Sequence, residues 1–180
     1  MPTQTITEIP TGAWSADGAH SRIEFAVDYM TGTFRGTFSP FEATFEVDPD
    51  TGLVLRGSAN VADVKVQDEN LEAHLQSPDF FDAERAPKIT FESKDVELDG
   101  ERVKVAGTLA IRGTEQPVEL EGTFAAPITD PFGRERIGVR LEGTIDRTAF
   151  GIDWNNPLPT GEPALANDVR ISAELYLVQA

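Results

Sequence analysis

Residues 102–124, RVKVAGTLAIRGTEQPVELEGTF, carry the strongest indication of the fold class. From Val103 to Ile111, and again from Val118 to Phe124, every second residue is apolar or glycine. Successive side chains of a β-strand point to opposite faces, so this alternation predicts two strands that each have one apolar face. Gly113, between the two rows, is typical of a tight turn. The stretch therefore predicts an antiparallel hairpin.

The same period of two extends over most of the chain. Further alternating rows occupy residues 23–29, 41–47, 53–61, 89–98, 137–145 and 169–177. Pro40 marks a bend or an edge position in a strand that starts near Phe34, and the fourth row slips register near Asp95. With a short opening strand near residues 13–17, the total is eight or nine. Strands of about 10 to 14 residues exceed the usual length of about 5 to 6, which favours a closed barrel over a sandwich of two sheets. We predict an all-β fold, a single antiparallel up-and-down barrel of about eight strands.

One segment, residues 62–87, interrupts the alternation. Asp68 is placed to cap a short helix in which Leu71, His74 and Leu75 share one face, and Pro78 would end it. We expect this helix to cross one end of the barrel.

Four glycines lie in phase with the inward apolar residues: Gly57, Gly107, Gly122 and Gly143. They are either corners that relieve strand coiling or positions that leave an apolar cavity, and the two roles can coexist. A barrel of about eight strands can hold one small ligand.

Length and charge narrow the possible functions. The 180 residues suit one domain, residues 13–180, after an N-terminal tail, residues 1–12. The formal charge of −16 argues against nucleic-acid binding and against docking on anionic membranes. Cysteine is absent, which removes thiol chemistry. Neither a secretory signal nor an apolar span is visible, so we expect a cytoplasmic protein without stable membrane insertion.

The sequence contains no complete catalytic or metal-binding motif, and we predict no catalytic residue, no metal and no cofactor. Its two histidines are His20 and His74. His20 and Ser21 are adjacent on a strand and point to opposite faces, so they are poorly placed to share a proton. One alternative is an enzyme that acts on a small lipid or polyketide-like substrate through His74 or His20. Another is a chaperone-like or stress-related interaction module that uses the exterior strands.

Three features near the expected barrel end each allow two interpretations, one structural and one in ligand binding. His74 either packs under the helix with a backbone partner or contacts a ligand head group. Phe80 and Phe81 are read first as plugs of the barrel end and second as ligand contacts. Arg147 is read first as part of a structural ion pair with Asp146 and second as an anion anchor.

The sequence resembles the YceI-like family, lipocalin-like proteins associated with polyisoprenoids and related long-chain lipids. The resemblance covers nearly the whole chain after the first dozen residues. It is carried by HSRIEFAV at 20–27, HLQSPDFFD at 74–82, GTLAIRG at 107–113, IDR at 145–147, FGI at 150–152 and DVRI at 168–171.

The resemblance implies a lipocalin-like barrel around an elongated apolar pocket, a homodimer, and no known catalytic group. It implies non-enzymatic binding, storage or transport of a long-chain isoprenoid, quinone-like or acyl lipid. The candidate ligand-binding residues are Phe25, Val27, Leu55, Leu71, His74, Leu75, Phe81, Phe91, Val105, Leu109, Leu120, Phe124, Val139, Leu141, Arg147 and Trp154.

One departure from the family bears on the ligand head group. Relatives often carry Arg-Asp where this chain has Leu71 and Glu72, so a basic anchor is lost from the helix. Arg112, Arg136 and Arg147 remain as candidate anchors. Since the protein is strongly acidic, we predict a ligand whose head is neutral or only weakly polar.

Overall fold

The structure, a computed structural model, describes residues 9–180. Its strands form one sheet of 11 strands. They are β1 (Gly12–Ala16), β2 (Arg22–Tyr29), β3 (Gly32–Phe38), β4 (Phe41–Asp48), β5 (Gly52–Asn60), β6 (Val64–Lys65), β7 (Lys88–Asp99), β8 (Arg102–Ile111), β9 (Thr114–Thr129), β10 (Glu135–Asp146) and β11 (Leu165–Gln179). The helices are η1 (Val61–Asp63), α2 (Glu69–Gln76) and η2 (Arg147–Phe150).

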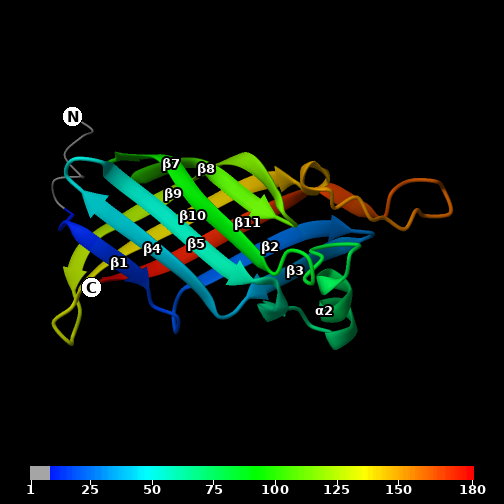
Figure 1. Cartoon of the computed structure of the whole chain (residues 1–180), viewed down its shortest axis with the longest axis horizontal. Helices are drawn as coiled ribbons and strands as arrows, with labels where there is room; N and C mark the ends of the chain where they lie inside the picture. Colours follow the sequence, from blue (N-terminus) through cyan, green and yellow to red (C-terminus); the bar gives the residue numbers. More distant parts are fainter. Residues whose placement is uncertain (1–8) are drawn as a thin grey trace.

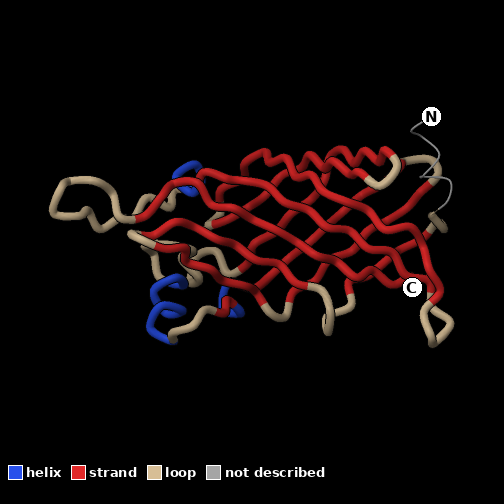
Figure 2. Tube along the Cα trace, turned by 180° about the vertical axis from the view of Figure 1, so that it is seen from behind, coloured by secondary structure: helices blue, strands red, loops and turns tan. Residues whose placement is uncertain are grey.

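Eight of the strands close into an antiparallel barrel, which confirms the predicted fold. The order around the ring is β1-β4-β5-β7-β8-β9-β10-β11, and β11 pairs again with β1. Two strands pair with the same edge of β11: residues 177–179 pair with β1, and residues 165–174 pair with β2. The strands β2, β3 and β6 therefore extend the wall at one end. α2 lies at that end of the elongated barrel, and the C-terminus lies at the other (Figure 1). Figure 2 shows the same arrangement from behind.

The structure contains both strand irregularities that the sequence predicts, one at Pro40 and one near Asp95. Pro40 separates β3 from β4, and each strand has its own partners, so the single long strand expected from Phe34 is two strands. The pairing of β7 with β8 shifts register between Ser93 and Asp95. The buried Ser93 hydroxyl accepts a hydrogen bond from the amide of Leu55 at 2.8 Å.

The end of the barrel away from α2 contains a core of buried apolar side chains. Trp14 is fully buried there and its indole nitrogen donates to the carbonyl of Pro10. Ile9, within the expected N-terminal tail, is also buried in this core; residues 1–8 of that tail lie outside the described residues. The closed-end core further contains Phe45, Val47, Leu53, Leu98, Val103, Val105, Phe124, Ile137, Val139 and Leu177.

An ion-pair network ties the β9–β10 turn to the β1–β2 turn at this closed end. The carboxylate of Asp130 accepts from Nε of Arg136 at 2.6 Å and from the amides of Phe132 and Arg134. Nη1 of Arg136 also donates to Asp17 at 3.1 Å. The bond from Arg136, with the two amide bonds, lowers the pKa of Asp130 to about 2.

This network predicts a specific acid sensitivity. A carboxyl whose pKa is lower in the folded than in the unfolded chain stabilises the fold above about pH 4, and that contribution is lost as the pH falls toward its folded pKa. We expect Asp130→Asn to melt at a lower temperature than wild type at pH 7 and to lose less melting temperature between pH 4 and pH 2. Thermal melts between pH 2 and pH 7 measure this difference, with the exposed Asp99→Asn as control. If the melting temperatures of Asp130→Asn and wild type fall in parallel with pH, the lowered pKa of Asp130 does not contribute to stability.

Candidate functional site

Local sequence signals fix the short helix at the open end. The side chain of Asp68 accepts hydrogen bonds from the amides of Asn70 and Leu71, so it caps α2 as expected. The helix ends at Gln76, just before Pro78. Leu75 is buried against the barrel, whereas Leu71 is 43% exposed. The segment that interrupts the alternating pattern therefore places α2 and the turn after it, residues 69–82, at the mouth of the barrel, and we call residues 69–82 the lip.

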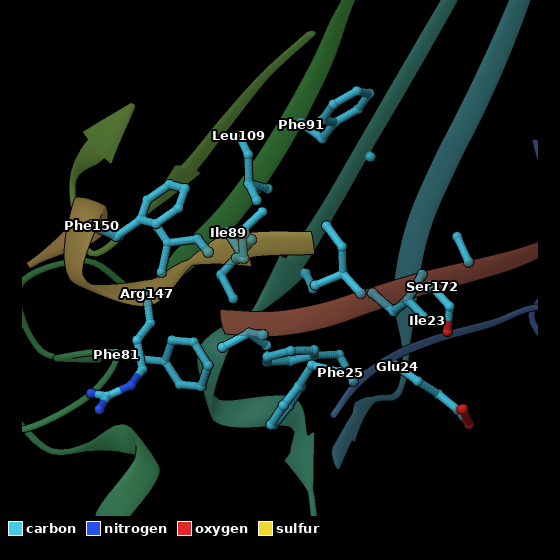
Figure 3. A pocket seen from close by; sticks show the side chains of 18 of the residues that line it. Ile23, Glu24, Phe25, Phe81, Ile89, Phe91, Leu109, Arg147, Phe150 and Ser172 are labelled. Carbon is cyan, nitrogen blue, oxygen red and sulfur yellow. The ribbon is translucent and has the colours of Figure 1, made fainter. Parts of the chain in front are cut away.

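The half of the barrel beneath this lip encloses a cavity of about 610 Å³. Its wall is almost entirely apolar, and Leu55, Leu141 and Leu175 of the closed-end core form its floor. Figure 3 shows Phe25 and Phe81 close together on one side of the pocket and Phe91 on another. A volume of this size lies within the usual range for small-molecule sites, about 300 to 1,000 Å³.

Aromatic rings gather at the mouth. The ring of His74 meets Phe80 edge-on at 4.9 Å and Trp154 at 5.1 Å between centroids. Nε2 of His74 lies 3.0 Å from a carboxylate oxygen of Asp79. His74 therefore has a side-chain partner rather than the backbone partner that one reading expected. The ring of Phe81 lies edge-on against that of Phe25 and lines the cavity.

Hydrogen bonds from Arg147 hold the loop that follows η2. Its side chain is 4% exposed and its guanidinium donates to the carbonyls of Ile152, Trp154, Leu165 and Ala166 at 2.8 to 3.3 Å. The expected ion pair with Asp146 is wrong, because Asp146 instead accepts from the amide and hydroxyl of Thr148. Burial lowers the pKa of Arg147, while the charges of Asp146 and Asp153 oppose that shift.

The guanidinium of Arg147 is turned away from Phe91 and Leu109 on the cavity wall (Figure 3). The other two candidate anchors are also engaged within the protein. Arg112 donates to the carbonyls of Gly151 and Pro78 and so joins the lip to the η2 segment. Arg136 belongs to the network at the closed end.

Comparison with known proteins gives the family. The model of the YceI-like domain matches residues 14–177. A UPF0312 protein from Staphylococcus aureus strain N315 is 34% identical over 161 residues, covering 87% of this chain and 92% of that protein. The chain belongs to the YceI-like family.

Solved structures share the YceI-like fold. BcnA from Burkholderia cenocepacia superposes with a TM-score of 0.75 at 24% identity, covering 92% of this chain and 99% of BcnA. The YCEI protein of Campylobacter jejuni gives 0.68 at 27% identity, covering 81% and 84%. A polyisoprenoid-binding domain from Saccharophagus degradans gives 0.68 at 12% identity, covering 93% and 98%.

The structure of this YceI-like chain brings most of the predicted residues to one cavity. The predicted residues that line it are Phe25, Val27, Leu55, Leu71, His74, Leu75, Phe81, Phe91, Leu109, Leu120, Leu141, Arg147 and Trp154. Val105, Phe124 and Val139 do not line it, and this part of the prediction is wrong. They are buried in the closed-end core together with Trp14. Contact between the lining residues and a ligand stays a prediction.

Several cavity residues were missed by the sequence analysis. Most lie on inward rows and could have been found by continuing the period of two; they include Ile23, Phe41, Ala43, Ala59, Ile89, Ile111, Val118, Ile145, Val169 and Ile171. Phe34 and Phe38 also line the cavity; they lie in the segment that the sequence predicted as a strand, but they were not named as ligand contacts. Phe150, Ile152 and Leu165 belong to segments with no period.

The two histidines of this YceI-like chain lie apart. His20 does not line the cavity: its Nδ1 lies 2.8 Å from Asp17, and its side chain is 64% exposed. Among residues 9–180, no cluster of three or more His, Asp or Glu side chains is arranged to hold a metal ion. Nor does that part of the chain contain a helix long and apolar enough to span a membrane.

Proposed function

We propose that the protein binds one long-chain amphiphile in the cavity and stores or carries it without changing it chemically. The ligand is an isoprenoid, quinone-like or fatty-acid-derived lipid. The observation that carries this proposal is the cavity of about 610 Å³ with apolar walls beneath a mouth that bears polar groups. The Saccharophagus degradans domain, which shares the fold, is described as polyisoprenoid-binding, and this supports the proposal.

The cavity volume bounds the length of the buried chain. A methylene group is about as large as a water molecule, which occupies about 30 Å³ in the liquid, so the cavity holds on the order of 20 such groups. Each buried methylene contributes about 0.8 kcal/mol. Ten of them contribute about 8 kcal/mol, equivalent to a Kd of about 1 µM before the entropic cost of association. Burial of a longer chain offsets that cost.

The mouth favours an uncharged head. The side chains of Arg112, Arg136 and Arg147 are bound to protein carbonyls or carboxylates. The formal charge of the chain is −16, so a diphosphate would enter a field of its own sign. His74 and Asn156, both on the cavity wall, offer hydrogen bonds that suit a hydroxyl or carbonyl group.

The arrangement at the mouth supports binding rather than catalysis. The hydroxyl of Ser77 donates to the carbonyl of His74, not to its ring, so this serine and histidine do not form a nucleophile and base pair. The homodimer and the cytoplasmic location expected from the sequence stay predictions.

The two tryptophans provide the test, because Trp14 lies in the closed-end core and Trp154 lies at the mouth. We expect a brominated long-chain alcohol to quench the emission of Trp154 in a Trp14→Phe variant in a saturable way. Unbrominated isoprenoid alcohol should reverse the quenching at a lower concentration than its diphosphate does, with less discrimination at high salt.

The matched variant Trp154→Phe, which keeps Trp14, should show little quenching. Equal quenching of both tryptophans, or none of either, would contradict a ligand seated beneath the mouth. Stronger competition by the diphosphate at low salt would contradict the uncharged head.

A further inference from the structure

Inward-facing glycines of the barrel differ in what surrounds them. At Gly36 and Gly107, an aromatic ring occupies the space that a side chain would take. The ring of Phe25 covers Gly36, and Cζ of Phe91 lies 2.7 Å from where a Cβ of Gly107 would be. A larger residue at either glycine would displace the ring.

At Gly122 and Gly143, the backbone of a neighbouring strand comes too close for a side chain. The carbonyl of Arg140 occupies the Cβ position of Gly122, and the carbonyl of Glu119 lies 2.8 Å from that of Gly143. With Gly107, whose Cβ would also lie 2.5 Å from the carbonyl of Glu92, these glycines are required by close packing. They fit the reading as corners of the barrel.

Gly57 is different, because nothing in the packing requires a glycine there. The nearest atom to its would-be Cβ is the carbonyl oxygen of Glu42, at an ordinary contact distance of 3.6 Å. Its φ lies outside the left-handed range, so a side chain would cause no backbone strain. A glycine inside a strand is less stable than most residues by roughly 0.5 to 1 kcal/mol relative to alanine. The glycine therefore lowers stability without a structural need.

The consequence of Gly57 is a recess in the cavity wall. Gly57 pairs with Ala43 on one side and Phe91 on the other, and all three line the cavity. Ala43 is small, and the ring of Phe91 leans over Gly107, away from Gly57. Arg56 also lines the cavity although its side chain is bound to Glu46 and Glu92 on the outer face, so backbone forms the wall here.

We propose that the recess at Gly57 and Ala43 receives a methyl branch of the bound chain, which makes Gly57 a specificity-determining residue for branched over linear chains. A linear chain has a uniform width and leaves the recess unfilled, and unfilled space forfeits contacts. A branched chain places a methyl group there and removes it from water. The inference rests on the proposed function and deepens it.

The test compares two alcohols that differ only in branching: hexadecanol, and phytanol, which is hexadecanol carrying methyl branches. We expect the wild type to bind phytanol more tightly. Gly57→Val should weaken phytanol binding about tenfold, because the valine occupies the recess, and should change hexadecanol binding less than about twofold. Gly32→Val is the matched control, since Gly32 is an exposed strand residue with nothing within 4 Å of its would-be Cβ. It should leave both affinities unchanged.

A fold check accompanies the binding data. Valine suits a strand better than glycine, so Gly57→Val should melt no lower than wild type, whereas Gly122→Ala should melt lower. Gly57→Ala provides a smaller step if valine distorts the wall. Unchanged phytanol binding in Gly57→Val, or equal weakening of both alcohols, would overturn the role of the recess. If the wild type binds neither alcohol, the proposed function itself is wrong and the recess has no ligand to select.

Discussion

Replacing Arg147 with methionine is expected to lower the free energy of unfolding by about 3 to 5 kcal/mol. Methionine fills part of the same volume but cannot donate hydrogen bonds. The change would leave four carbonyls, those of Ile152, Trp154, Leu165 and Ala166, without their charged donor. An unsatisfied buried polar group costs about 1 to 3 kcal/mol, and some of these carbonyls would regain water partners.

The effect should extend to the mouth of the cavity. Arg147 holds the loop that carries Trp154, whose ring packs against His74 and Phe80. We therefore expect the emission of Trp154 in Arg147→Met to shift toward that of an exposed indole even where the barrel remains folded.

Denaturant unfolding measures the stability change. Arg147→Lys keeps the charge but lacks the planar fork of donors, and we expect it to lose most of the same stability. Arg102→Met, at an exposed arginine of β8, is the control and should change stability by less than about 0.5 kcal/mol. A loss below about 1 kcal/mol in Arg147→Met would mean that the loop does not depend on this side chain.

The period of two predicts which face of a strand a residue occupies, but not how far along the barrel it lies. Leu109 and Val105 both point inward from β8, yet Leu109 lines the cavity and Val105 is packed. Val105 belongs to the same buried core as Trp14, which comes from a different part of the chain. The barrel, its turns and the capped helix could therefore be predicted from the sequence, whereas the division into a packed and a hollow half could not.

The hydrogen-bond partners of the polar side chains could not be predicted from the local sequence pattern either. Arg147 stands beside Asp146 in sequence, but its partners are carbonyls of the loop after η2 and of the first two residues of β11, up to 19 residues away. The glycines show the same limit: Gly57 and Gly107 have the same phase, but the ring of Phe91 and the carbonyl of Glu92 fill the space at Gly107 and not at Gly57. Sequence spacing does not determine such long-range contacts.

Blocking the cavity should have the largest effect on binding. Leu120 lines the cavity from β9, and Leu120→Trp would place a bulky ring in the volume that we assign to the ligand. We expect phytanol affinity to fall at least about 100-fold, since loss of about three or four buried methylene sites removes about 3 kcal/mol. Leu109→Trp, on β8, provides a second block at a different point of the wall.

Glu121→Trp is the matched control, because Glu121 is the next residue on the same strand and is exposed on the outer face. Its affinity for phytanol should equal that of wild type. Thermal melts of all three variants establish that each is folded before binding is compared.

Calorimetric titration of phytanol, delivered from cyclodextrin, into wild type and these variants tests most directly whether the barrel is a lipid-binding protein. We expect one molecule bound per chain with a Kd near or below about 1 µM in wild type and Glu121→Trp, and severe weakening in Leu120→Trp and Leu109→Trp. No uptake of phytanol by wild type, or binding as tight as wild type in both folded cavity-blocked variants, would show that the cavity is not a lipid-binding site.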